Sequence, residues 1–373
     1  MSKKGLLIVY NAHNLLEFIW YYCTDKEARD IEWDALCLPS GVKGEYMSPY
    51  CEKSGIFSNI YKDNKAFSDE SAIKQLPLFA KMLGYFIVGK RKSLCRKKLN
   101  EYVDADRYDI IAVLSDFGIL SGMAIGLGKE TVILEDGTAD YRIRSNKNIL
   151  KFLTSSFSWK GFILSKLGYA NTAYIYPLKT TSGCVKYCSH PEMMPYKNYK
   201  EIRTLFDYSD TDREKYDSII KSIYSEIDNC DFDSADTVLF TNNIGDFTLE
   251  PDEYIKRLEN YVSKISDNTI IKKHPRDETE YAFSDKVVVQ NVDQTIPAEV
   301  ILPYIRGKRI IFLAASSVIL YMRLSDFDLE CAYFTGMAEK SAKQTTHARY
   351  LPRDEMAALF SKFGAADIRF VEI

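Results

Sequence analysis

The chain has 373 residues, 46% of them hydrophobic and 27% charged, which is enough for two α/β domains that each bury a core of their own. Its 49 Lys and Arg nearly balance 52 Asp and Glu, and the resulting net charge of -3 argues against a nucleic acid partner. The longest apolar run, near 310–322, is interrupted by two serines, so neither a transmembrane helix nor a signal peptide is expected. The eight cysteines form no CxxC pair, which favours reduced thiols in a cytosolic protein.

Short β-branched runs alternate with stretches of helical period along the chain, which indicates strand-helix-strand units and mostly parallel sheets. In the first half, strands are predicted at 5–10, 32–38, 108–115 and 131–134, with helices at 13–24, 69–102 and 117–128. In the second half, strands are predicted at 237–241, 269–273, 286–290 and 309–313, with helices at 251–265, 297–305 and 316–324. We therefore expect an α/β fold with two Rossmann-like lobes.

The segment 142–236 differs from both halves. It contains a basic amphipathic stretch at 147–167, a loop rich in Tyr, Pro and Ser, and a polar helix at 211–227. We place a first domain at 1–195, including the basic linker helix, and a second at 196–350. The helix and tail at 351–373 are expected to cross back to the first domain.

In an open parallel sheet, ligands bind at the carboxyl ends of the strands, so the residues directly after each strand are informative. Glu135 and Asp136 follow the strand 131–134 and precede a glycine that can turn the chain. Neighbouring residues in extended chain point to opposite faces, so one carboxylate can aim at a ligand while the other supports the turn. A purely structural acidic turn is the alternative.

His274 follows the strand 269–273, precedes Pro275 and is flanked by Lys272 and Arg276. The proline restricts His274 to extended conformations, which would hold the imidazole in place. Only four histidines occur in the chain, and this one lies among cations at a strand end, where a core histidine is not expected. We therefore consider His274 a candidate functional residue.

Ser316 and Ser317 follow the strand 309–313 and open an apolar helix. The dipole and free N–H groups of a helix N-terminus favour phosphate, although simple capping by Ser316 fits as well. Glu299 lies in a helix start after Pro297, where it could bind ribose hydroxyls or complement the helix dipole. Glycosyl transfer needs a base for the acceptor hydroxyl and a group that stabilises the departing phosphate, and these residues could supply both.

Four motifs together resemble those of the bacterial sialyltransferases of the lipooligosaccharide and capsule type, glycosyltransferase family 52 and the related family 38 polysialyltransferases. They are LEDGT at 134–138, KKHP at 272–275, IPAE at 296–299 and AASS at 314–317. The resemblance implies a GT-B fold whose two parallel sheets face a central cleft, a CMP-sialic acid donor, inversion at the anomeric carbon, and no required metal or cofactor. Three Asp-x-Asp strings, at 104–106, 231–233 and 326–328, are interpreted as solvated turns.

The resemblance also implies residue roles. Glu135 would be the general base, Asp136 would support it, and His274 would be the general acid or phosphate partner. The residues assigned to nucleotide binding lie at or near strand ends of the second half: Thr241, Asn242, Lys272, Pro275, Glu299, Ser316 and Ser317.

On this basis the chain is expected to move sialic acid from CMP-sialic acid to a glycan acceptor, most simply the terminal galactose of a bacterial lipooligosaccharide or capsule. A polysialyltransferase, a nucleotide-sugar epimerase of similar two-lobed fold and a glycan-binding protein without catalysis are the alternatives. Acceptor, linkage and a homodimeric state are left open by the sequence.

Two basic stretches are candidates for peripheral contact with the inner face of the cytoplasmic membrane. Lys90–Lys98 contains six cations and no acid, and four lysines stud the apolar stretch Lys147–Leu167. A lipid-linked acceptor would suit such contact. An exposed helix face and a polyanionic glycan are the alternative explanations for these charges.

Overall fold

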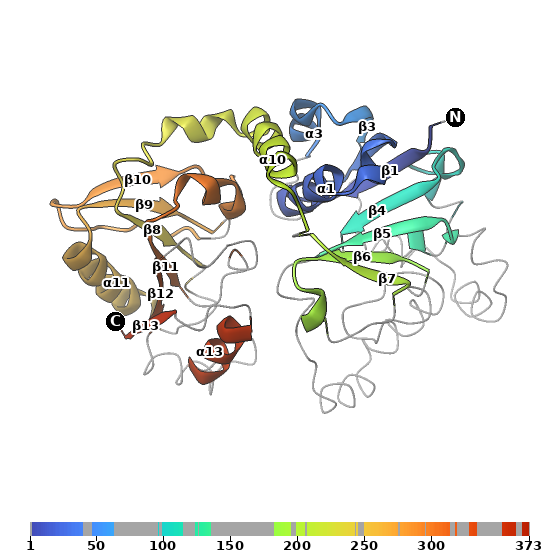
Figure 1. The fold of residues 1–373 in the computed structure, drawn as a ribbon. Coiled ribbons are helices and arrows are strands. Elements are labelled where there is room, and N and C mark those ends of the chain that lie inside the picture. The colour runs from blue at the N-terminus through green and yellow to red at the C-terminus, as the bar shows by residue number, and fades with distance from the viewer. Residues whose placement is uncertain are drawn as a thin grey trace, which may run out of the picture. The chain divides into compact units, whose positions relative to one another are not determined.

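The computed structural model describes residues 2–39, 47–62, 96, 99–114, 124–125, 127–135, 183–194, 199–205, 207–242, 244, 250–274, 277–294, 296–313, 318, 328–333, 353–362 and 368–372. It divides the chain into two compact units, Met1–Ile223 and Tyr224–Ile373. Each unit contains a parallel sheet, as the ribbon in Figure 1 shows. The predicted α/β fold with two Rossmann-like lobes is confirmed.

The first unit contains a seven-stranded sheet in the order β3-β2-β1-β4-β5-β6-β7, and every described pair of strands is parallel. Its strands are β1 (Lys4–Val9), β2 (Glu32–Cys37), β3 (Phe57–Lys62), β4 (Ile110–Leu114), β5 (Glu130–Leu134), β6 (Val185–Cys188) and β7 (Glu201–Thr204). Its helices are α1 (Ala12–Thr24), α2 (Lys26–Arg29), α3 (Ser48–Ser54) and α10 (Asp210–Ile223), with short 3-10 turns η1 (Ala105–Arg107) and η3 (Pro191–Met193).

The central strands β1 and β4 are almost wholly buried, as expected for parallel strands covered on both faces. Gly5 lies opposite Trp33 in the register of β1 and β2. A Cβ atom on Gly5 would stand 2.4 Å from Trp33 Cε3, so only glycine fits beneath the indole ring. α1 begins after Asn11, whose side-chain oxygen accepts a hydrogen bond of 2.9 Å from the Asn14 amide.

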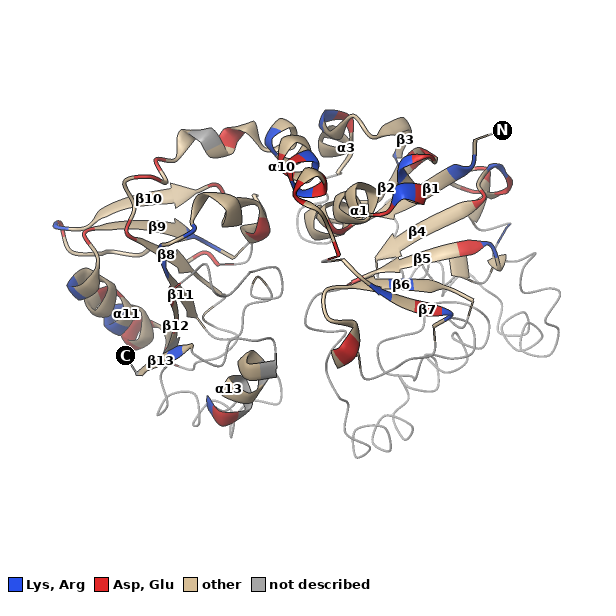
Figure 2. Ribbon diagram, in the orientation of Figure 1, with Lys and Arg blue, Asp and Glu red and all other residues tan. Residues whose placement is uncertain are grey.

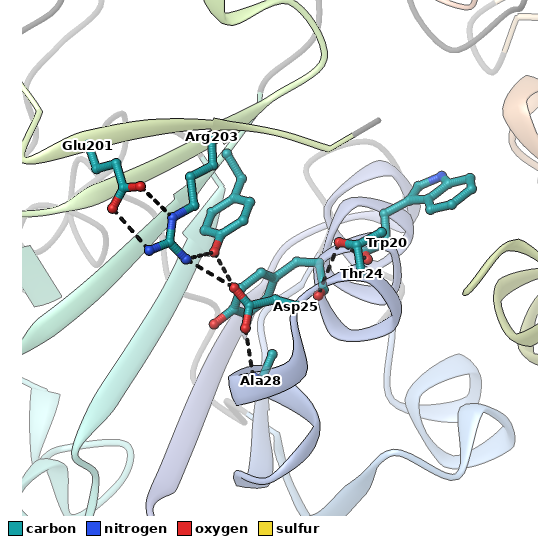
Figure 3. A network of polar contacts seen from close by, with 8 residues as sticks. Trp20, Thr24, Asp25, Ala28, Glu201 and Arg203 are labelled. Carbon is teal, nitrogen blue, oxygen red and sulfur yellow. Dashed lines mark hydrogen bonds and ion pairs between the residues drawn. The ribbon is translucent and has the colours of Figure 1, made fainter. Parts of the chain in front are cut away.

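A polar network ties the end of α1 to the edge of the same sheet (Figure 3). Asp25 caps α2 by accepting from the Ala28 amide at 3.1 Å, and it also accepts from the Tyr187 hydroxyl of β6 and from Arg203 Nη1 of β7 at 3.2 Å. Arg203 is held in turn by Glu201 through two hydrogen bonds of 2.8 and 3.0 Å. The short strands β6 and β7 are thereby attached to the helical layer.

The second unit contains a six-stranded parallel sheet in the order β10-β9-β8-β11-β12-β13. Its strands are β8 (Thr237–Phe240), β9 (Asn268–Lys272), β10 (Val288–Val292), β11 (Arg309–Leu313), β12 (Asp328–Tyr333) and β13 (Arg369–Glu372). Its helices are η4 (Ser225–Asn229), α11 (Pro251–Ile265), η6 (Ala298–Tyr304) and α13 (Arg353–Lys362). α11 packs Tyr254, Leu258 and Val262 onto a core built from β8, β9 and β11.

The structural division after Ile223 lies later in the chain than the predicted boundary at 195–196. β7 pairs with β6 in the first sheet, and α10 stacks Tyr216 on Trp20 of α1 with ring centroids 3.9 Å apart. The tail predicted at 351–373 contributes β13 to the second sheet beside β12, so it belongs to the second unit. The helix predicted at 297–305 is the 3-10 helix η6, which contains Pro303.

Charges of both signs are mixed along the described helices, as α10 and α11 illustrate in Figure 2. Of the two basic stretches, Lys147–Leu167 lies outside the described residues, as does Lys90–Lys98 apart from Arg96. The Arg96 guanidinium makes an exposed ion pair of 3.1 Å with Asp106. Membrane contact therefore stays a prediction. Within the described part of the chain, no helix has the length and apolarity needed to span a bilayer.

Candidate functional site

Both sheets contain a point at which the strand order reverses. In the first it lies between β1 and β4, and in the second between β8 and β11. Crevices at such points, outside the carboxyl ends of the strands, are where open α/β sheets bind ligands. Of the sequence-predicted residues, Thr241 and Asn242 follow β8 at the second of these points, and the others that the structure describes are located below for each unit separately.

Glu135 is the residue directly after β5, and it is completely buried. The amide of Ser189, the residue directly after β6, donates a hydrogen bond to Glu135 Oε2. Lys186 of β6 is also fully buried and donates from Nζ to the Leu134 carbonyl at 2.8 Å. The carboxylate is therefore fixed at the carboxyl end of the sheet by the neighbouring strand. Asp136 lies outside the described residues.

His274 follows β9, and its backbone is held on both sides. Its amide donates to Thr241 Oγ1 at 3.2 Å, and its carbonyl accepts from Gln294 Nε2 at 2.6 Å and from the Asp277 amide at 2.8 Å. The Thr241 amide donates to the Lys272 carbonyl at 3.1 Å, which extends the pairing of β8 and β9. Thr241 and His274 are therefore in direct contact, as their shared position at strand ends predicts. Pro275 lies outside the described residues.

Asn242 spans the switch point of the second sheet. Its Nδ2 atom donates to the carbonyl of Leu313, the last residue of β11, while Asn242 itself follows β8. This contact fixes the backbone from which the AASS motif departs. Ser316 and Ser317 lie outside the described residues, so their assignment to phosphate stays a prediction. The Asn242 side-chain amide, which the sequence assigned to the nucleotide, donates to the end of β11.

Lys272 is the last residue of β9 and is 2% exposed. Its ammonium donates to the carbonyls of Lys273 at 2.8 Å and Gln294 at 3.2 Å. Burial lowers the pKa of Lys272 from 10.5 to about 8, against the opposing negative charges of Glu299 and Asp293. Glu299, in the first turn of η6, is thus electrostatically coupled to the end of β9.

This pKa gives a prediction for stability. Between pH 8 and 10.5 the unfolded chain binds more protons at Lys272 than the folded chain, so the free energy of unfolding should rise with pH there. Relative to Lys272→Met, the wild type should gain about 3 kcal/mol across this window. Urea unfolding at pH 7.5 and 10.5 measures the difference. Lys264→Met, which removes an exposed lysine, is the control, and identical pH profiles for wild type and Lys272→Met would contradict the shift.

Sequence reasoning missed four residues that hold these groups: Lys186, Ser189, Asp277 and Gln294. Lys186 is a single charged residue within the short, otherwise mostly apolar stretch 185–188. That charge is the one signal that the sequence offered. Two of the three Asp-x-Asp strings begin turns, as predicted. The Asp104 side chain accepts from the Asp106 amide at 3.2 Å, and that of Asp231 from the Ser234 amide at 3.2 Å. Within the described ranges, no three His, Cys, Asp or Glu side chains gather as a metal site would require.

The architecture of two parallel Rossmann-like sheets is that of a GT-B glycosyltransferase. A family model described as alpha-2,8-polysialyltransferase matches residues 56–325, which is well over half of the chain. The chain belongs to this family, and the resemblance to bacterial sialyltransferases is confirmed.

Two solved structures are among those similar to the chain. One is the alpha/beta-galactoside alpha-2,3-sialyltransferase from the luminous marine bacterium Photobacterium phosphoreum, with 11% identity and a TM-score of 0.47 over 99% of this chain and 98% of that chain. The other is the glycosyltransferase SnogD from Streptomyces nogalater, with 11% identity and a TM-score of 0.48 over 100% of this chain and 87% of that chain. A comparison with curated protein sequences found no match.

Proposed function

We propose that this member of the family transfers sialic acid from CMP-sialic acid to a glycan hydroxyl, with inversion and without a required metal. The observation that carries the proposal is the position of the Lys272–His274 segment. It lies at the carboxyl end of β9, next to the switch point that Asn242 spans, where a nucleotide would bind. Family membership supports sialic acid as the transferred sugar.

In the proposed reaction, the acceptor hydroxyl oxygen forms a bond to the anomeric carbon of sialic acid while the bond from that carbon to the phosphate oxygen breaks. Glu135 takes the hydroxyl proton, and CMP leaves with the electron pair of the broken bond. His274 stabilises the departing phosphate, together with Ser316, Ser317 and the N-terminus of the helix predicted at 316–324. Attack opposite the departing phosphate inverts the configuration of the anomeric carbon.

Recognition of the donor nucleotide in this proposal relies on residues at the carboxyl end of the second sheet. Glu299 would accept hydrogen bonds from the ribose, and the positive charge of Lys272 would favour the phosphate. The Thr241 hydroxyl donates to Asp277 and accepts from the His274 amide, so its contribution to donor binding would pass through His274. Asn242 contributes by fixing the end of β11.

A second candidate concerns the acceptor. The terminal galactose of a lipooligosaccharide or capsule is the simplest acceptor for single transfer. The family match instead favours extension of a sialic acid chain through α2,8 linkages, because that is what the matching family is described as doing. The two differ only in the hydroxyl that attacks, so one set of reactions distinguishes them.

Incubation of the protein with CMP-sialic acid and fluorescent oligosaccharides is expected to yield new sialosides and free CMP, with EDTA present. A galactose-terminated and a sialic acid-terminated acceptor are compared by chromatography and mass spectrometry. Stepwise longer products from the second acceptor alone would support polysialylation, and a single addition to the first would support transfer to galactose. Isomerised nucleotide sugar without any glycoside would contradict the proposal in favour of an epimerase. Turnover lost in EDTA and restored by Mg²⁺ would contradict metal independence.

A further inference from the structure

Asp277, three residues after His274 in the chain, has a buried carboxylate that takes no part in the chemistry proposed above. It is 1% exposed. Its Oδ2 atom accepts from the hydroxyls of Thr241 and Tyr281, the latter at 2.9 Å, and its Oδ1 atom accepts from the Thr279 amide at 3.1 Å. A buried charge is retained only where it is well hydrogen-bonded, and three donors meet that need here.

The same residue controls both backbone polar groups of His274. The Asp277 amide donates directly to the His274 carbonyl at 2.8 Å. On the other side, the His274 amide donates to Thr241 Oγ1, and that hydroxyl donates onward to Asp277. Gln294 also holds both residues, because its Nε2 atom donates to the carbonyls of His274 and Asp277 at 2.6 and 2.8 Å.

The direction of these hydrogen bonds explains why a carboxylate is needed. Thr241 can accept from the His274 amide in this arrangement because its own hydrogen points at Asp277. A carboxylate without a proton only accepts hydrogen bonds, so the Thr241 and Tyr281 hydroxyls and the Thr279 amide all point their hydrogens toward it. An asparagine has an NH2 group in place of one carboxylate oxygen. In one orientation this group would face the Thr241 and Tyr281 hydroxyls, and in the other it would face the Thr279 amide. Either orientation sets donor against donor and disturbs the chain of hydrogen bonds.

We propose that Asp277 is a positioning residue that sets the place of the His274 imidazole through the Thr241 hydroxyl and through the hydrogen bond from its own amide to the His274 carbonyl. The inference rests on the proposed role of His274 in sialyl transfer. Small displacements of a reacting group cost catalysis strongly, whereas loss of one buried hydrogen bond alone costs stability. The two consequences can be measured separately.

The test compares Thr241→Val, Thr241→Ser, Asp277→Asn and Tyr281→Phe with the wild type. Thr241→Val removes the bridging hydroxyl at nearly constant volume, and both it and Asp277→Asn should lower kcat for sialyl transfer about 10- to 100-fold. Thr241→Ser should restore most of the activity. Tyr281→Phe is the matched control, because it removes a hydrogen bond to the same carboxylate but leaves the Thr241 bridge intact. It should lower Tm and leave kcat unchanged.

Two further measurements show whether the effect passes through His274. CMP affinity by calorimetry should stay within about twofold in Thr241→Val, because the loss concerns position and not nucleotide binding. In a His274→Ala background, adding Thr241→Val should cause no further loss of kcat, since the group that it positions is already gone.

The outcomes distinguish this inference from the proposed function. If His274→Ala abolishes transfer while Thr241→Val and Asp277→Asn change only Tm, as Tyr281→Phe does, the positioning role is overturned and the proposed function stands. If His274→Ala keeps wild-type turnover, the proposed role of His274 and the positioning role are both overturned. Should Asp277→Asn fail to fold, Thr241→Val at wild-type kcat overturns the inference by itself.

Discussion

Replacement of Glu135 by glutamine is expected to lower kcat for sialyl transfer by about 10²- to 10⁴-fold, the usual contribution of a general base. Glutamine keeps the size of the side chain and can still accept the Ser189 amide hydrogen bond through its carbonyl oxygen, so the fold around β5 should persist. The amide cannot take a proton from the acceptor hydroxyl. CMP binding should be nearly unchanged, because the base acts only as the acceptor attacks. Steady-state kinetics and nucleotide calorimetry measure the two quantities.

The control for this variant lies on the same strand. Glu130 begins β5 at its amino end, is exposed, and pairs with Lys3 at 3.3 Å, so Glu130→Gln should retain wild-type kcat. Asp136→Asn should have a smaller effect than Glu135→Gln if Asp136 only supports the turn. The reverse ranking would transfer the base role to Asp136, and near-normal rates for both variants would refute the proposed base.

Replacement of His274 by alanine is expected to cost about 10²- to 10³-fold in the chemical step, the typical effect of removing one group that stabilises developing charge. The contacts of His274 with Thr241, Asp277 and Gln294 use only main-chain atoms of His274, so alanine should preserve them. Single-turnover reactions with saturating CMP-sialic acid separate this loss from weaker donor binding. Added imidazole should restore part of the rate by occupying the space that the side chain leaves.

A His274→Ala variant with normal single-turnover rates would show that the imidazole has a structural role. Ser316, Ser317 and the N-terminus of the helix predicted at 316–324 would then be left to stabilise the departing phosphate. Loss of donor affinity without loss of rate would instead assign His274 to ground-state binding.

The sequence predicted the continuously buried central strands of both sheets, and it also predicted β10, an edge strand that is largely not buried. β1, β4, β8 and β11 lie at the centres of their sheets, and their apolar runs therefore distinguish them from their surroundings. The strands that it missed, β3, β6, β7, β12 and β13, lie at or toward the sheet edges. Several of them contain charged residues that are satisfied only by partners distant in the chain, such as Lys186 with the carbonyl of Leu134 and Arg203 with Asp25.

The candidate site was predictable to the extent that it follows one rule, the position after a strand. That rule located Glu135 and His274. Thr241, the last residue of a predicted strand, was assigned through the family resemblance, and the structure shows its contact with His274. It could not locate Gln294, which reaches His274 because β10 pairs with β9 in a particular register. Asp277 could not be predicted either, because its role depends on a hydrogen bond from the Thr241 hydroxyl, which lies 36 positions earlier in the chain.

Each sheet is assembled from an uninterrupted part of the chain: β1 to β7 end at Thr204, and β8 to β13 begin at Thr237. Among the described strands, those of the first sheet can pair before any strand of the second sheet has been synthesised. During synthesis, at roughly 5–20 residues per second, the first sheet is complete on the order of ten seconds before the last strand of the second leaves the ribosome. The Glu135 segment can therefore reach its hydrogen-bonded position on the nascent chain, and misfolding between the two halves is limited by this order of emergence.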